Sequence, residues 1–441
     1  MADAKARPQL KPVPQGVVEL TSLPDRSGGK YGRIGADGGI VELKDGRLLL
    51  VQGGGIVETR QTAPVKRTSE DGGVTWSEAT PLECGTGIGG VIRLQSGKLA
   101  AYGINGPVLN YVTSEDDGVS WSEPAPIPVY PDFRPMFHSL IQIQNGRMLL
   151  TGRWETEKLN CYAPDLLPIT DTRWGWWRGV PFFMAGHRWP EMGICKTYYS
   201  DDEGRNWNEC HGGLFGWFNE QGVPDGTGCI TDVYEPTSAE TADGRLLLFA
   251  RSKRGRLVQA YSVDRGERWL SMQPTELASY QSPPLLIRIP STGDLLCVWN
   301  QVSGEEIRRF YSRGRLSAAI SRDSGLTWEN FKTIEVQEGL EEVSRIAPEY
   351  PIPANLRGNF GPAALPDGFA MFSYPNVDIV GDRVFLRYAR MWPEIVEDKI
   401  PPKELELTLD SLWPSSTPED RCVTMTSEGV MRVYPLDWFY E

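Results

Sequence analysis

Short apolar runs, each preceded by a polar turn that contains glycine, recur along the chain. Leu48–Val51 follows the turn at Gly46, and Leu246–Ala250 follows the turn at Gly244. Such runs predict β-strands joined by hairpins, and the spacing typical of amphipathic helices is nearly absent. The pattern therefore predicts an all-β protein. Six turns of this kind occur, at Lys44–Leu48, Gln95–Leu99, Gln144–Met148, Ala242–Leu246, Ser291–Leu295 and Val380–Val384.

A second repeat is an eight-residue stretch in which Ser, Asp, Gly and Trp keep fixed spacings. The Asp carboxylate can accept hydrogen bonds from N–H groups further along the turn, and Gly permits a positive φ. The Trp is expected to pack onto the sheet as a large apolar side chain. We interpret the stretches as structural turns rather than as metal or ligand sites. The five copies are Ser69–Trp76, Ser114–Trp121, Ser200–Trp207, Ser262–Trp269 and Ser321–Trp328.

One hairpin followed by one eight-residue stretch supplies four strands, which is one blade of a β-propeller. Six hairpins predict six blades within a single domain over residues 31–441, preceded by an N-terminal arm over residues 1–30. In the sixth blade we expect Val430–Tyr434 to be the closing strand. Blade 1 is expected to run from about Tyr31 to Pro81, and blades 2 to 5 to end near Pro126, Gly212, Gln273 and Thr333.

The third predicted blade contains a long insertion. From Gly146 to Ser200 the chain advances 54 residues, whereas the corresponding step from Gly244 to Ser262 is 18. The surplus is rich in tryptophan, with Trp176 at its centre. Aromatic rings on a propeller can stack against a sugar, and the alternatives are a packed loop or a subunit contact through which the chain oligomerises.

Composition narrows the possible functions. The 441 residues carry a net charge of −13, without a basic stretch, which argues against non-specific binding to nucleic acid. No apolar run is long enough to cross a membrane, and no signal peptide is visible, so a cytoplasmic location is expected. Seven cysteines without a CxxC pair suggest reduced thiols, and three histidines lack the spacing of a zinc site. We expect neither a metal nor another cofactor.

The eight-residue stretch resembles the Asp box, or BNR repeat, of sialidases and related propellers. This resemblance implies a six-bladed, sialidase-like β-propeller whose boxes lie at the rim, away from the active site. The segment that contains Glu235 and Arg251 is similar to the fourth-blade signature of sialidases, and the segment at Arg313 to the fifth. Phe372–Pro375 resembles the sixth-blade segment that carries the nucleophile.

The resemblance implies roles for these residues. Tyr374 is the nucleophile, Glu235 is its partner, and Arg251 and Arg313 bind a substrate carboxylate. A phenol suits a sialoside because a carboxylate nucleophile would be repelled by the sugar's own carboxylate. Arginines bind carboxylates in a bidentate manner and keep their charge. From the residues alone, an ion pair for Glu235, a core position for Tyr374 and bridges between blades for the arginines stay open.

Two positions depart from the sialidase pattern. The first-blade arginine is expected about ten residues before Gly46, where this chain has Ala36, and Arg33 is the nearest candidate. The stretch between Gln52 and Thr68, where the family has its acid/base aspartate, contains only one carboxylate, that of Glu58. Glu58 is therefore the candidate general acid.

The sequence as a whole predicts an exo-acting, retaining glycoside hydrolase for terminal sialic acid or another acidic sugar. Two alternatives stay open. One is a non-catalytic carbohydrate-binding propeller, and the other is a different sugar-cleaving enzyme, hydrolase or lyase, on the same scaffold.

Overall fold

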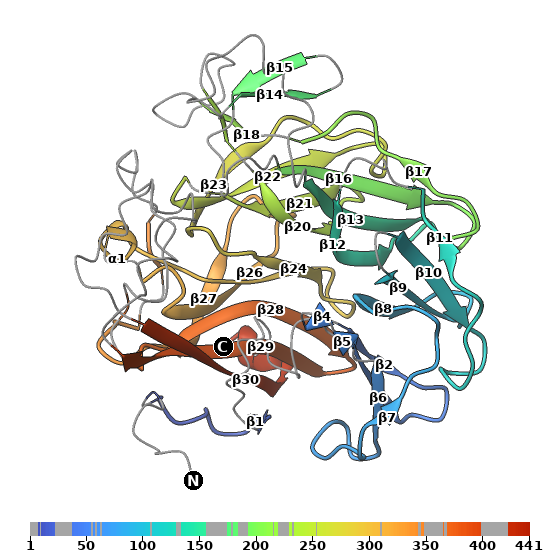
Figure 1. The fold of residues 1–441 in the computed structure, drawn as a ribbon, viewed down its shortest axis with the longest axis horizontal. Coiled ribbons are helices and arrows are strands. Elements are labelled where there is room, and N and C mark those ends of the chain that lie inside the picture. The colour runs from blue at the N-terminus through green and yellow to red at the C-terminus, as the bar shows by residue number, and fades with distance from the viewer. Residues whose placement is uncertain are drawn as a thin grey trace.

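Six four-stranded antiparallel sheets follow one another around a common centre in the computed structural model (Figure 1). The prediction of an all-β, six-bladed propeller is thereby confirmed. The structure describes residues 8, 10–22, 38–53, 56–57, 60–61, 64–105, 108–128, 134–155, 174–177, 180–183, 193–214, 216–218, 229–231, 233–252, 254–308, 311–342, 345–347, 365, 368–397 and 422–441. Within these residues, no helix has the length and apolar character needed to cross a membrane.

In blades 1 to 5 the strands run from the centre outward in chain order. Blade 1 consists of β2 (Gly39–Glu42), β3 (Leu48–Gln52), β6 (Val65–Ser69) and β7 (Thr80–Pro81). Blade 2 consists of β8 (Gly90–Arg93), β9 (Leu99–Asn105), β10 (Val108–Ser114) and β11 (Ala125–Pro126). Blade 3 consists of β12 (Arg134–Gln142), β13 (Met148–Glu155), β16 (Gly193–Ser200) and β17 (Asn208–Glu209).

The second half of the ring has the same construction. Blade 4 consists of β20 (Tyr234–Glu240), β21 (Leu246–Arg251), β22 (Arg256–Ser262) and β23 (Gln273–Ala278). Blade 5 consists of β24 (Leu285–Arg288), β25 (Leu295–Trp299), β26 (Arg315–Ser321) and β27 (Glu329–Val336). Blade 6 combines β28 (Met371–Val380), β29 (Arg383–Glu397) and β30 (Cys422–Pro435) with β1 (Val18–Thr21) from the N-terminal segment.

The predicted turns lie where the sequence places them. Each of the six glycine turns joins the first and second strands of a blade, and each eight-residue stretch joins the third and fourth strands of blades 1 to 5. Buried apolar side chains on the second strands, such as Leu48–Val51 and Leu246–Ala250, fill the space between neighbouring blades. Their burial on both faces explains why these runs are continuously apolar rather than alternating.

Closure of the ring differs from the expectation. Val430–Tyr434 lies in β30, but β30 is the third strand of blade 6, and the outermost strand is β1, with Val18 opposite Val433. The predicted closing strand is therefore wrong, because β29 and β1 pair with β30 on both sides. Part of the segment set apart as an N-terminal arm is thus a strand of the propeller. Joining the two ends of the chain in one sheet leaves no open seam in the ring.

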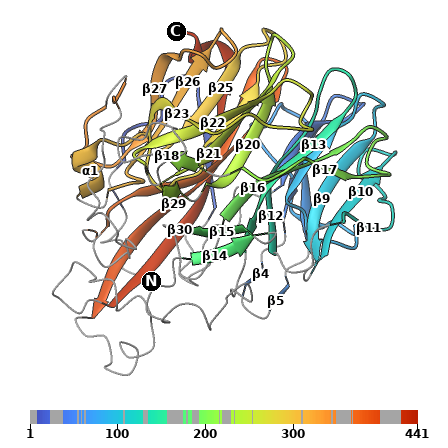
Figure 2. The ribbon, with the colours of Figure 1, turned by 90° about the horizontal axis from the view of Figure 1, so that it is seen from above.

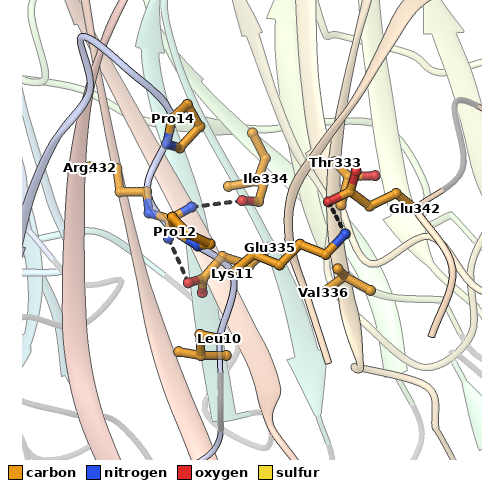
Figure 3. A pocket seen from close by; sticks show the side chains of 10 residues that line it. All are labelled: Leu10, Lys11, Pro12, Pro14, Thr333, Ile334, Glu335, Val336, Glu342 and Arg432. Carbon is orange, nitrogen blue, oxygen red and sulfur yellow. Dashed lines mark hydrogen bonds and ion pairs between the residues drawn. The ribbon is translucent and has the colours of Figure 1, made fainter. Parts of the chain in front are cut away.

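A buried cluster of ion pairs stabilises the packing of the N-terminal strand and blade 6 against blade 5. Arg432 of β30 donates to Glu335 of β27 at 2.7 Å and to Glu19 of β1 at 2.7 Å, and Arg390 of β29 also pairs with Glu335. These contacts join blade 5, blade 6 and the N-terminal strand. A cavity of about 170 Å³ lies beside Arg432, under Leu10–Pro14 (Figure 3). It lies at the outer side of blades 5 and 6, away from the strand ends described below.

The eight-residue stretches form the same hydrogen-bonded turn in all five copies. In the first, Asp71 accepts hydrogen bonds from the Thr75 hydroxyl and from the N–H groups of Thr75 and Val74, which holds its pKa at about 2. The Ser69 hydroxyl accepts the N–H of Gly73 at 2.8 Å. The turn also reaches across to the neighbouring blade. Trp328 of the fifth copy, for example, packs against Phe249 of blade 4.

The glycine of each stretch has a positive φ and lies against the preceding blade. A Cβ at Gly266 (φ +88°) would lie 2.5 Å from Leu149 of blade 3, whereas a Cβ at Gly244 (φ +81°) would meet nothing within 4 Å. We expect Gly244→Ala to lower the free energy of unfolding by about 1 kcal/mol through backbone strain. Gly266→Ala should cost about 1–3 kcal/mol more, because it also overpacks the contact between blades. Urea denaturation of both variants tests this, and equal losses would contradict the packing role.

Candidate functional site

The connections of the propeller define two different faces. Because the strands alternate in direction, each inner strand begins at the face that also carries the links from second to third strands. The small hairpin β4 (Ile56–Val57) with β5 (Arg60–Gln61), the hairpin β14 (Trp174–Trp177) with β15 (Val180–Phe183), and the helix α1 (Gly304–Arg308) are such links. Figure 2 shows the two hairpins on one side of the molecule, together with extended ends of β29 and β30. The eight-residue stretches lie at the opposite face.

Two side chains from different blades meet where the inner strands begin. The Tyr374 hydroxyl of β28 donates to Glu235 Oε1 of β20 at 2.8 Å, across 139 residues of sequence. Glu235 is only 3% exposed, whereas Tyr374 is half-buried. The carboxylate therefore lies behind the phenol, and the phenol is the more accessible of the two.

Both residues adopt the same unusual backbone conformation. Glu235 has φ +48° and Tyr374 has φ +55°, and in each strand the pairing with the second strand shifts at this point. Pro236 and Pro375 follow directly. Since proline has no N–H to contribute to the ladder, it tolerates the interrupted pairing of a bulge. Such left-handed positions in non-glycine residues often accompany functional sites, because they redirect a side chain at a cost in strain.

Two arginines hold the Glu235 carboxylate. Arg251, at the end of β21, donates through Nη1 to Oε2 at 2.6 Å, and Arg153 of β13 lies 3.6 Å from Oε1. Burial lowers the pKa of Arg251, but Glu235, Tyr374 and Tyr234 together outweigh this effect and raise that pKa above its ordinary value. Arg251 is only 5% exposed, and its guanidinium is paired with Glu235 rather than open to solvent. Its predicted contact with a substrate carboxylate stays a prediction.

Arg313, which precedes β26 of blade 5, lies next to Tyr374. Its guanidinium is 5.2 Å from the centre of the Tyr374 ring, within the range of a cation–π interaction. It donates to the Ser373 hydroxyl at 2.8 Å and to the Gln281 carbonyl at 3.2 Å. Arg313 is half-buried and so remains partly accessible. Three guanidinium groups therefore surround the Glu235–Tyr374 pair.

Arg153 was not predicted from the sequence, although a signal for it exists. It is the fifth residue after Met148, the first residue of its second strand, and Arg251 is the fifth residue after Leu246 in the next blade. The two arginines therefore occupy equivalent positions in neighbouring blades. Ser373 and Gln281, which fix Arg313, were also missed, because their contacts with Arg313 span 60 and 32 residues and follow no spacing within a single segment.

The described residues do not test three of the predicted site residues. Arg33 and Glu58 lie outside the described residues. Trp176 lies in β14, in the hairpin at the same face, and its side chain is outside the described part of the structure. The general acid, the first-blade arginine and the stacking tryptophan thus stay predictions.

Comparisons with known proteins agree with this fold. The profile of the BNR repeat-like domain family matches residues 95–386, about two thirds of the chain. A search of curated protein sequences finds no significant match. The match confirms the resemblance seen in the eight-residue stretches.

Several solved structures are similar in fold. A protein of unknown function from Dyadobacter fermentans is 14% identical, with 94% of this chain and 99% of that chain covered and a TM-score of 0.50. A sialidase mutant from Streptococcus pneumoniae is 10% identical, with a TM-score of 0.46, and the match covers 84% of this chain but 65% of that one. An α-L-arabinofuranosidase mutant from Fusarium graminearum is 12% identical, with 96% and 99% covered and a TM-score of 0.47. At these identities, the likeness concerns the fold alone.

Proposed function

This chain belongs to the BNR repeat-like domain family, and we propose that it is a sialidase-like, exo-acting and retaining glycoside hydrolase for a terminal acidic sugar. The observation that carries the proposal is the 2.8 Å hydrogen bond from Tyr374 to Glu235 within a cluster of arginines. A phenol bonded to a buried carboxylate has the geometry of a nucleophile with its base.

In the proposed reaction, the Tyr374 oxygen attacks the anomeric carbon while its proton moves to Glu235 Oε1. The bond from the anomeric carbon to the leaving oxygen breaks, and that oxygen takes a proton from the general acid, for which Glu58 is the candidate. Water, deprotonated by the same acid/base group, then displaces Tyr374 from the sugar, and Glu235 returns the proton to the phenol. Two displacements retain the anomeric configuration.

The charge around the pair supports an acidic substrate. Arg153, Arg251 and Arg313 bring three positive charges to a pair that carries one negative charge while Tyr374 is protonated. Among the described residues this leaves an excess of positive charge, which an anionic group entering the site would relieve. Arg313 is the most accessible of the three, so it is the arginine that we expect to meet the carboxylate first. The net charge of −13 on the whole chain disfavours long polyanions, which supports a small terminal sugar.

A panel of aryl glycosides of sialic, uronic and neutral sugars tests the proposal. We expect release of the aryl group from an acidic α-glycoside, with a first product of retained configuration in NMR. Preference for a neutral sugar would refute the acidic substrate. An unsaturated product would indicate a lyase, and binding without release would indicate a carbohydrate-binding propeller.

A further inference from the structure

Arg153 reaches Glu235 from a neighbouring blade. It comes from β13, the second strand of blade 3, whereas Glu235 comes from β20, the first strand of blade 4. Its guanidinium lies 3.6 Å from Glu235 Oε1 and 5.0 Å from the centre of the Tyr234 ring. Because Arg153 is 9% exposed and packed over that ring, it has little freedom to turn away from the carboxylate.

The two arginines hold different oxygens of the same carboxylate. Arg251 binds Oε2, and Arg153 lies next to Oε1, the oxygen that accepts the Tyr374 hydroxyl. A carboxylate with a cation at one oxygen and only a neutral hydroxyl at the other can still rotate about its last side-chain bond, because that torsion is broad. A cation next to the second oxygen fixes the plane of the carboxylate. Arg153 therefore acts on the atom that would receive the proton.

We propose that Arg153 is a positioning residue that keeps Glu235 Oε1 directed at Tyr374 and keeps Glu235 ionised before the reaction. This inference rests on the proposed function and adds a residue to it. The charged and titratable groups placed against Glu235 include Arg251 of β21, Tyr374 of β28 and Cys195 of β16. Burial raises the pKa of the Cys195 thiol, so this group stays neutral and Arg153 is a main source of the charge that acts on Oε1.

The test compares two substitutions at this position. Arg153→Gln removes the charge, and we expect kcat to fall about 10- to 100-fold. We also expect the acidic limb of the pH profile of kcat/KM to move up by about one pH unit, because a carboxylate without its cation takes up a proton more readily. Arg153→Lys keeps the charge but not the shape, so kcat should fall while the acidic limb stays in place.

A control comes from the other end of the same strand. Arg147 is also buried and pairs with Asp201 and Glu267, far from the Glu235–Tyr374 pair. Arg147→Gln should lower the thermal stability and leave the pH profile unchanged. If Arg153→Gln leaves the acidic limb where it is, or if Arg153→Lys has the kcat of the unmodified protein, the positioning role is refuted. The lysine variant decides the question if the glutamine variant does not fold.

A second readout requires no substrate and separates this inference from the proposed function. Crystal structures of the unmodified protein and of Arg153→Gln show the orientation of the Glu235 carboxylate directly. We expect Oε1 to turn away from the Tyr374 hydroxyl in the variant, so that the 2.8 Å hydrogen bond is lost. A turned carboxylate together with no glycosidase activity in the unmodified protein would uphold Arg153 and refute the proposed reaction. An unchanged hydrogen bond in Arg153→Gln would refute the role of Arg153, whatever the substrate.

Discussion

Tyr374→Phe is expected to lower kcat by on the order of 10³-fold or more while ligand affinity changes little. The substitution removes only the hydroxyl that donates to Glu235 Oε1, and the ring can keep its contact with Arg313. Without the hydroxyl, no nucleophile remains at the end of the buried carboxylate. Steady-state kinetics on the best substrate of the glycoside panel, together with calorimetric titration of the product sugar, measure both quantities.

A matched control is Tyr111→Phe in blade 2. Tyr111 is a buried tyrosine whose hydroxyl, like that of Tyr374, donates a hydrogen bond, in this case to the Glu203 carbonyl at 3.0 Å. Its loss should reduce stability without affecting turnover. If Tyr374→Phe kept more than about a tenth of the activity, the tyrosine could not be the nucleophile.

The second large effect concerns stability. Arg251→Met is expected to lower the free energy of unfolding by about 3 kcal/mol, because it leaves the Glu235 carboxylate buried without its shortest ion pair. The loss should be largely restored when Glu235→Gln is added, because a neutral amide costs less to bury than an unpaired charge. Urea denaturation of the two single variants and the double variant gives the coupling energy.

Additive losses in that double-mutant cycle would mean that the ion pair contributes little and that Arg251 stabilises the blade only by its packing. Arg251→Lys serves as the control. It retains the charge, and it should therefore lose less stability than the methionine variant. The same proteins show whether loss of the Glu235 carboxylate also removes activity, as the proposed mechanism requires.

The repeats could be predicted because their interactions are local. In the first eight-residue stretch, the hydrogen bonds of the Asp71 carboxylate reach no further than Thr75, four residues away. A short sequence with fixed spacing therefore specifies the whole turn. The same holds for the glycine turns, which join strands that are adjacent in the chain. Their number and order were sufficient to predict six blades.

The site was predicted only in part. Glu235, Arg251, Arg313 and Tyr374 were chosen through a resemblance to segments of sialidases, and the structure places them together at one end of the inner strands. The resemblance did not indicate that Arg251 is buried against Glu235. It also did not predict Arg153, which comes from another blade. Arg153 can be recognised only when the sequences of the second strands are aligned with each other.

The sequence by itself thus determined the all-β class, the six blades and the five turns that fasten blades 1 to 5, because each depends on contacts between residues close in the chain. Tertiary structure alone decided which strand closes the ring and which buried side chains, such as Arg153, join the predicted residues at its centre. Arg432 meets Glu19 across 413 residues, and Tyr374 meets Glu235 across 139. Such contacts leave no periodic signal, since they depend on the path of the whole ring rather than on the spacing within any one segment.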